Sequence, residues 1–415
     1  MKSLFFLKIL GFSATFLFFS IGAKYIPIEK FGLLMTLLAL SVPLTFLFSS
    51  GLPLTANTMI SQNKIRFKLF YFKSLKLICF SCLLFSTILF IPITLIYQLP
   101  FHETIIYLIF IFLNCVLFLN TQMFQSIEKT KLSFIFNIYG MKGVFLPISL
   151  IFSILFIGLI EMDFEISYIL FYFCICVLSL ALSSFFILKK YFSLNNNKNQ
   201  YDSIKLIKNG AALSLHNIFA SMYIPILLTI IFVFFQEKTL SVYQANTRIL
   251  IVLMNFANSV LMPIFIPKIG ALFIENRKSF FDRLKKMFLI NLLLVSSVFF
   301  VFYFAYENII IALANEKYIL KLNDFFILFF SCTLFTIFNP LINSFSYLQN
   351  NNFILSKIHF LNLIIMFFII FLLKTFNYFN PQIISLIILG YPNIFLAFYI
   401  LKFDRFRMRA HSSIG

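Results

Sequence analysis

Three basic side chains lie within apolar segments of this 415-residue chain: Lys8, Lys142 and Arg248. A charged group deep in a bilayer is costly and usually faces a bundle interior or a water-filled cavity. Lys and Arg bind phosphate and carboxylate groups through charge-assisted hydrogen bonds. A fourth cation, Lys24, ends the apolar segment that holds Lys8. The chemistry that these residues indicate is non-covalent capture of an anionic head group.

For each cation the alternative is snorkelling, in which the aliphatic stem stays in the bilayer and the charge reaches its surface. Lys8 lies near the start of its apolar segment and Lys24 at the end, which favours snorkelling for both. Lys142 lies roughly 13 Å from the nearer end of its segment, at the helical rise of about 1.5 Å per residue. That depth favours a cavity for Lys142, and both interpretations stay open for Arg248.

Amide and hydroxyl side chains repeat at helical spacing around these cations. Gln244, Arg248 and Asn255 share one face of a helix, and Lys142 shares a face with Ser149 and Ser153. Asn217 belongs to a third stripe, formed by Gly210, Ser214, Asn217, Ser221, Pro225 and Thr229. Stripes of small polar residues are typical of helix-packing seams. The alternative is a cavity in which amides and hydroxyls bind sugar.

The composition determines which elements carry these residues. Hydrophobic residues make up 61% of the chain and charged residues only 11%, against about 25% charged in soluble domains. A soluble enzyme, a secreted disulfide scaffold and a disordered chain are therefore excluded. We expect an all-α integral membrane protein with twelve spans. The predicted spans cover 4–23, 32–57, 77–97, 104–124, 134–158, 166–188, 210–235, 243–267, 287–306, 325–343, 358–376 and 383–401. Because Pro43, Gly51 and Pro53 interrupt the second, we interpret it as one broken helix.

The basic residues are distributed unevenly between the loops. Of the 33 Lys and Arg residues, 24 fall in loops on one side, six on the other and three within spans. The positive-inside rule assigns the richer side to the cytoplasm, which predicts cytoplasmic N- and C-termini. The net charge of +19 is then a topology signal, aided by attraction of basic loops to anionic phospholipids. Nucleic acid binding is not implied.

A polar, Asn-rich stretch divides the chain near its midpoint. It predicts an N-terminal six-helix lobe at 1–195, a cytoplasmic linker at 196–209 and a C-terminal six-helix lobe at 210–415. Pro43 and Pro53 in the second span are matched by Pro263 and Pro267 in the eighth. Interrupted helices at matching positions of two halves indicate a transport pathway, although membrane helices also tolerate proline.

Several kinds of chemistry lack the residues they need. No Asp or Glu lies within a predicted span, and the four His residues form no nucleophile constellation. All six Cys lie in apolar spans, where they are expected to be small buried hydrophobes. We therefore predict no catalytic residues, no metal and no cofactor, and we expect a non-enzyme.

Two short motifs lie around the second span, and two others lie in the second half of the chain. They are Glu29-Lys30-Phe31-Gly32, Ser50-Gly51-Leu52, Tyr243-Gln244-Ala245-Asn246-Thr247-Arg248-Ile249 and Asn308-Ile309-Ile310-Ile311-Ala312-Leu313. These four motifs resemble those of the Wzx-type polysaccharide flippases of the multidrug/oligosaccharidyl-lipid/polysaccharide exporter superfamily, although the usual Gly after the last motif is missing. The twelve-span architecture and the cationic interior extend the resemblance over nearly the whole chain.

This resemblance implies two lobes that open alternately to cytoplasm and periplasm in the bacterial inner membrane. The cargo would be an oligosaccharide repeat unit on undecaprenyl pyrophosphate, for O-antigen or capsule, and other polysaccharide assembly proteins would be partners. Arg248 carries over from the family motif, whereas Lys142 is inferred from this sequence alone. Rival interpretations are a multidrug or cation exporter of the same superfamily, another lipid-linked flippase, and a polysaccharide polymerase. An exporter of cations should have a membrane carboxylate, and a polymerase should have a large outer loop rich in Arg.

Overall fold

The computed structural model describes residues 2–61, 67–137, 144–160, 164–192, 203–235, 237–254, 277–338 and 352–399. Within these ranges the chain forms helices and turns, and no strand. Nine of the described helices are long and apolar enough to cross a membrane, and Phe145–Leu159 and Leu322–Ile337 are shorter apolar helices. These helices confirm the expected all-α membrane fold. Helices are expected there because a backbone segment in lipid must satisfy its hydrogen bonds internally.

Each of the twelve predicted spans overlaps a helix. The first part of the chain forms α1 (Lys2–Tyr25), α2 (Ile28–Phe48), α3 (Leu52–Ser61), α4 (Phe67–Tyr97), α5 (Phe101–Ser126), α6 (Thr130–Ile135), α7 (Phe145–Leu159), α8 (Ile166–Lys189) and α9 (Ser203–Phe234). A helix of residues 237–254 follows. The later part forms α11 (Arg277–Leu313), the 3-10 helix η2 (Glu316–Tyr318), α12 (Leu322–Ile337), α14 (Asn352–Thr375), α15 (Pro381–Ser385), the π-helix η3 (Leu386–Gly390) and a helix of residues 391–399.

Proline and charge mark the helix ends. Pro27 and Pro100 directly precede α2 and α5, where the backbone N–H that proline lacks would have no helical partner. Acidic residues occupy the first turns of three helices, and basic residues occupy the last turns of three others: Glu29, Glu103 and Asp324, then Lys24, Lys189 and Lys374. Both placements complement the helix dipole.

Two predicted spans contain a break. The span at 32–57 is two helices, α2 and α3, joined by a turn in which Ser50 has φ 48° and Gly51 has φ 65°. This confirms one broken element. The prediction of a continuous helix at 134–158 is wrong, because α6 ends at Ile135 and α7 begins only at Phe145.

The chain divides into two compact units. The first comprises Met1–Ala245 and Leu313–Lys317, and the second comprises Asn246–Ala312 and Tyr318–Gly415. Helix α9, which we had placed in the C-terminal lobe, packs against α2 and α3 within the first unit. Packing in one conformation does not define which helices move together, so the lobes at 1–195 and 210–415 and the linker at 196–209 stay predictions.

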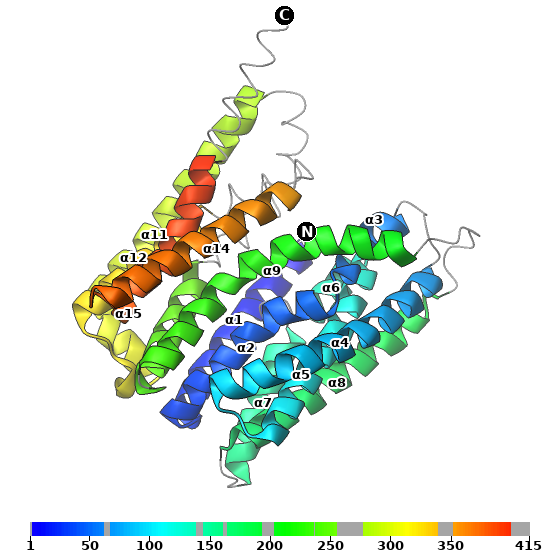
Figure 1. Ribbon diagram of the computed structural model, residues 1–415, viewed down its shortest axis with the longest axis horizontal. Helices are drawn as coiled ribbons and strands as arrows, with labels where there is room; N and C mark the ends of the chain where they lie inside the picture. Colours follow the sequence, from blue (N-terminus) through cyan, green and yellow to red (C-terminus); the bar gives the residue numbers. More distant parts are fainter. Residues whose placement is uncertain are drawn as a thin grey trace, which may run out of the picture. The chain divides into compact units, whose positions relative to one another are not determined.

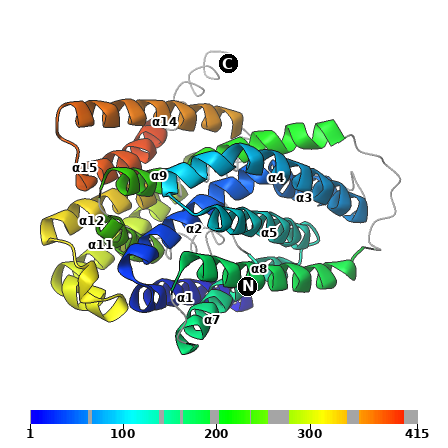
Figure 2. The same ribbon diagram turned by 60° about the horizontal axis from the view of Figure 1, so that its bottom comes forward.

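The first unit is built around α2 and α5, the two most deeply buried of its candidate spans. Helix α5 lies between α4 and α8 in both views (Figure 1, Figure 2). The Tyr107 hydroxyl of α5 donates to the carbonyl oxygen of Leu37 on α2 at 2.7 Å. The Asn120 amide donates to the Ala181 carbonyl at 3.0 Å and to the Ser184 hydroxyl at 2.8 Å, both on α8. These contacts make α5 the scaffold of the unit.

In the second unit, α12 packs against α15 and η3. The Asn393 amide donates to the Phe335 carbonyl of α12 at 2.9 Å. Helix α11 is kinked at Ala305, with φ −130° and ψ 17°. Directly after the kink, the Tyr306 ring stacks on Phe325 of α12, with ring centroids 3.8 Å apart. Aromatic stacking therefore holds the kinked end of α11 against α12.

Candidate functional site

The helix of residues 237–254 buries several polar side chains. Ser241, Gln244, Asn246 and Thr247 are all completely buried, and Arg248 is half-buried. A buried polar group has lost its hydrogen bonds to water, so it is costly unless it finds a protein partner or a ligand. These side chains fall into three groups according to their partners.

The first group is anchored on the start of α2. The Ser241 hydroxyl donates to the Ile28 carbonyl and also to the Glu237 carbonyl of its own helix, the latter at 3.1 Å. A Cβ at Gly32 would lie 3.0 Å from both the backbone nitrogen and the Cα of Ser241, so only glycine permits this approach. Close backbone packing through a small residue is a common way for membrane helices to associate.

A second anchor holds Asn246. Its amide donates to the Tyr318 carbonyl at 2.8 Å, and its side-chain oxygen accepts from the Tyr306 hydroxyl at 3.1 Å. The Tyr306 oxygen in turn accepts from the backbone N–H of Leu320 at 2.8 Å. This network ties the helix to the connection between α11 and α12.

Gln244 lies between these two anchors along the helix, and Thr247 and Arg248 lie after the second. In the part of the chain that the structure describes, neither the side-chain nitrogen nor the oxygen of Gln244 has a hydrogen-bond partner, and the Thr247 hydroxyl has none. Each unpaired buried group costs about 1–3 kcal/mol. Gln244 and Arg248 are four residues apart, so they lie on the same face of the helix, as the sequence predicts. A carboxamide and a guanidinium on one face can bind phosphate and hydroxyl oxygens together.

The polar stripe of α9 makes contacts with other helices at both of its ends. The Ser214 hydroxyl donates to the Phe46 carbonyl of α2 at 2.8 Å. A Cβ on Gly51 would lie 2.2 Å from the Gly210 carbonyl oxygen, so the α2–α3 turn and α9 are in backbone contact. Near the other end, Thr229 bonds to Tyr97 of α4 with 2.6 Å between the hydroxyl oxygens. Both ends of this stripe are packing seams.

The other predicted site residues are placed as follows. Asn217 is half-buried in the middle of α9, where the Ser221 hydroxyl donates to its carbonyl at 2.6 Å. Lys8 is half-buried on α1, and Lys24 is exposed in the last turn of that helix. Lys142 and Asn255 lie outside the described residues. Of the predicted site residues, Gln244 and Arg248 lie on one face of the same helix.

Ser149 and Ser153, which the sequence grouped with Lys142, make helix contacts. The Ser149 hydroxyl donates to the Phe145 carbonyl at 2.8 Å, and the Ser153 hydroxyl donates to the Ser149 carbonyl at 3.0 Å. The Ser153 oxygen also lies 3.1 Å from the sulfur of Cys176 on α8. These two serines are part of the seam between α7 and α8.

Sequence reasoning placed Glu103 at the outer end of a span and did not predict that this carboxylate is buried. Glu103 lies in the first turn of α5, just before the predicted start of that span, and only 8% of it is exposed. Its side-chain oxygen accepts from the backbone N–H of Ser167, at the start of α8, at 3.1 Å. The start of α8 has backbone N–H groups without a helical acceptor, and the Glu103 carboxylate supplies an acceptor for one of them. This contact explains why Glu103 is buried. Only the packing of α8 on α5 reveals this role.

Comparison with known proteins gives the fold. No family model matches the chain, and no curated protein sequence matches it. Among solved structures, an inward-facing multidrug resistance MATE family transporter of the MOP superfamily aligns with a TM-score of 0.71 at 12% identity, covering 98% of this chain and 96% of that one. The lipid II flippase MurJ, in an inward closed conformation, aligns with a TM-score of 0.67 at 14% identity, covering 97% and 87%.

A variant of the Vibrio cholerae MATE transporter VcmN aligns with a TM-score of 0.62 at 11% identity, covering 97% of this chain and 94% of that one. The alignments cover nearly the full length in each case. The chain therefore has the fold of the MOP-superfamily transporters, a class that contains exporters and a flippase of lipid-linked cargo. The structural neighbours are transporters and not enzymes.

Proposed function

We propose that this protein is a flippase. It moves undecaprenyl-pyrophosphate-linked oligosaccharide repeat units from the cytoplasmic to the periplasmic leaflet of the bacterial inner membrane by alternating access. The product serves the biosynthesis of a surface polysaccharide, either O-antigen or capsule. Its partners are the lipid-linked oligosaccharide, anionic phospholipids at the basic cytoplasmic loops, and other polysaccharide assembly proteins.

The observation that carries the proposal is the face formed by Gln244 and Arg248. A fully buried carboxamide that has no partner among the described residues, one turn from a guanidinium, supplies donors for phosphate and both donors and acceptors for sugar hydroxyls. Lys142 and Asn255 are proposed as further members of this lining, on sequence grounds. The fold supports the choice, because one of its structural neighbours is a flippase for a lipid-linked substrate.

A cation exporter of the same superfamily is the second candidate, since several structural neighbours are multidrug transporters. Such a protein is expected to hold a buried carboxylate within a membrane span, facing its cargo. Glu103, the buried acid in the described part of the chain, instead accepts the backbone N–H of Ser167. Because the Glu103 carboxylate is used in this helix contact and does not face a cargo, the flippase is favoured over the cation exporter.

The test uses purified protein in liposomes loaded with a fluorescent undecaprenyl-pyrophosphate oligosaccharide. The protein should speed the exposure of the fluorophore to a membrane-impermeant quencher, and the same label on an uncharged polyprenol should not respond. Uptake of an organic cation such as ethidium into the same liposomes should be absent. Cation uptake without movement of the lipid would replace the flippase by the exporter.

A further inference from the structure

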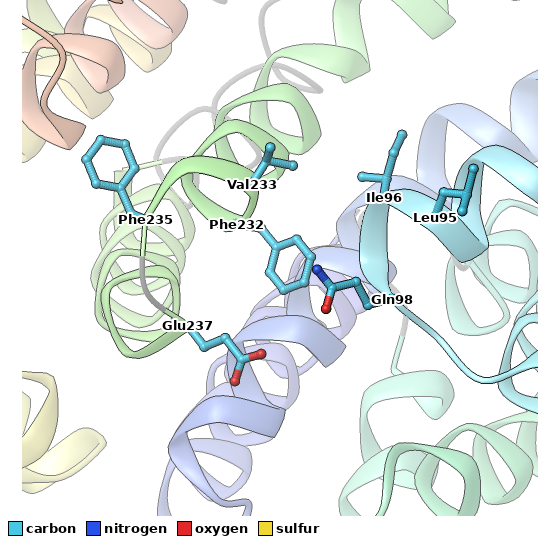
Figure 3. A pocket seen from close by; sticks show the side chains of 7 residues that line it. All are labelled: Leu95, Ile96, Gln98, Phe232, Val233, Phe235 and Glu237. Atoms are coloured by element: carbon cyan, nitrogen blue, oxygen red, sulfur yellow. The ribbon is translucent and has the colours of Figure 1, made fainter.

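A concave site separate from the Gln244–Arg248 face lies within the first unit. It has a volume of about 470 Å³ and is formed by the end of α4, the end of α9 and the start of the helix of residues 237–254 (Figure 3). Its walls are mainly apolar and include Leu95, Phe232, Val233 and Phe235. Two polar side chains, Gln98 and Glu237, complete the lining.

One wall of this cavity is held rigidly from behind. The Tyr97 ring, only 3% exposed, lies against Phe232 with 5.6 Å between ring centroids. The Thr229 hydroxyl donates to the Pro225 carbonyl at 2.8 Å, so the 2.6 Å contact between Tyr97 and Thr229 is donated by the tyrosine. The Phe232 ring is therefore fixed before any ligand binds.

The polar groups of the cavity are available. Gln98 is exposed in the turn between α4 and α5 with φ 52°, and Glu237 is exposed at the start of its helix. Within the described part of the chain, neither side chain makes a hydrogen bond or an ion pair. Figure 3 shows the Gln98 carboxamide beside the Phe232 ring and the Glu237 carboxylate extending into the same space.

We propose that this cavity binds an ammonium group carried on an apolar body. The face of an aromatic ring attracts a cation, and a nearby carboxylate neutralises it, which is the chemistry of quaternary-ammonium recognition. The exposed apolar surfaces of Leu95 (71%) and Val233 (51%) take the body of the ligand. An anionic ligand is disfavoured, because Glu237 is the one charged side chain among the described residues of the lining.

A sugar is disfavoured for a different reason. An oligosaccharide presents many hydroxyl groups, whereas the described residues of this lining offer one carboxylate and one carboxamide among apolar side chains. The ammonium group can come from a free organic cation or from a lipid head group such as that of phosphatidylethanolamine. The proposal does not depend on the flippase assignment, and the site has no residue in common with the Gln244–Arg248 face.

The experiment measures binding of benzyltrimethylammonium to the purified full-length protein in detergent, by microscale thermophoresis. Binding should saturate, and benzyl tert-butyl ether, an uncharged compound of similar shape, should bind at least fivefold more weakly. Glu237→Gln should weaken the probe about fivefold and Phe232→Leu about threefold. Glu307→Gln, which removes an exposed carboxylate that does not line the cavity, is the matched control and should leave affinity unchanged.

Each variant is checked for a single symmetric peak in size-exclusion chromatography, and Phe235→Leu replaces Phe232→Leu if the latter does not fold. The source of the ammonium group is tested in nanodiscs of phosphatidylglycerol mixed at a fixed ratio with either phosphatidylethanolamine or an uncharged glycolipid. Weaker probe binding with phosphatidylethanolamine identifies the lipid head group as occupant, and equal binding identifies a free cation. Equal affinity for the ether, no effect of Glu237→Gln, competition by maltose, or absence of saturable binding would each overturn the proposal.

Discussion

The α5–α8 pair and the helix of residues 237–254 both bury polar side chains, and two of these amides, Asn120 and Gln244, differ in their partners. On α5, the Asn120 amide makes two hydrogen bonds to α8, and the Glu103 carboxylate accepts the backbone N–H of Ser167 in the first turn of that helix. On the other helix, Gln244 is equally buried, yet neither of its polar atoms has a partner in the described chain.

This contrast separates polar groups that hold the fold from polar groups that are kept for a ligand. A protein recovers the cost of burying an amide when the amide cross-links two helices. Retaining a buried amide without partners lowers stability by roughly 1–3 kcal/mol. A function that uses the amide explains why it is retained, and Arg248 one turn away indicates what that function binds.

The largest expected effect is at Arg248. Arg248→Ala should reduce surface polysaccharide at least tenfold in a deletion strain complemented at matched expression, because the guanidinium provides the charge for the pyrophosphate. Arg248→Lys should retain part of the activity, since the charge remains and the two-pronged geometry is lost. Lys317→Ala removes an exposed cation from the 3-10 helix η2 and serves as the control. Normal polysaccharide display from Arg248→Ala would contradict the proposal that the Gln244–Arg248 face binds the ligand.

The next effect concerns the backbone contact of the α2–α3 turn with α9. Gly51→Ala should lower the stability of the protein by more than about 2 kcal/mol, because the left-handed backbone alone costs roughly 1–2 kcal/mol and the new Cβ meets the Gly210 carbonyl. Gly158→Ala is the control, since its Cβ would meet nothing closer than 3.7 Å. Thermal unfolding in detergent followed by fluorescence-detected size exclusion measures both. Equal unfolding temperatures would contradict the close approach.

The comparison itself is tested by replacing each buried amide with leucine. Asn120→Leu should destabilise the protein by about 1 kcal/mol, because it removes two hydrogen bonds between α5 and α8 and leaves the Ala181 carbonyl without that donor. Gln244→Leu should leave stability equal or higher while lowering polysaccharide display severalfold. Unfolding temperature and display are measured for both variants. Loss of stability in Gln244→Leu comparable to that in Asn120→Leu would show that Gln244 is structural.

The smallest effect is expected at the α4–α9 seam. Tyr97→Phe removes the hydroxyl that donates to Thr229 and keeps the ring against Phe232. Unfolding in detergent should show a loss of about 0.5 kcal/mol, in the range of hydrogen bonds between membrane helices. Tyr168→Phe, at an exposed position on α8, provides the matched control. A loss as large as that of Asn120→Leu would mean that this seam belongs to the scaffold.

Pattern alone predicted the helices well. Every predicted span overlaps a helix, and the broken second span was recognised from Pro43, Gly51 and Pro53. The physical reason is the solvent, because lipid offers the backbone no hydrogen bonds and an apolar run of sufficient length has to become a helix. The exception is the span at 134–158, where the apolar character continues while the helix does not.

The roles of the polar residues were decided only by tertiary structure. Ser214, Thr229, Gln244 and Arg248 all lie in helical stripes of the same kind in the sequence. Ser214 and Thr229 bond to α2 and α4, whereas Gln244 bonds to nothing in the described chain. The sequence by itself determined that these residues lie on helix faces within a membrane, because that follows from local periodicity. Their partners belong to helices up to 168 positions away along the chain, so only the packing of those helices could distinguish a seam from a candidate binding face.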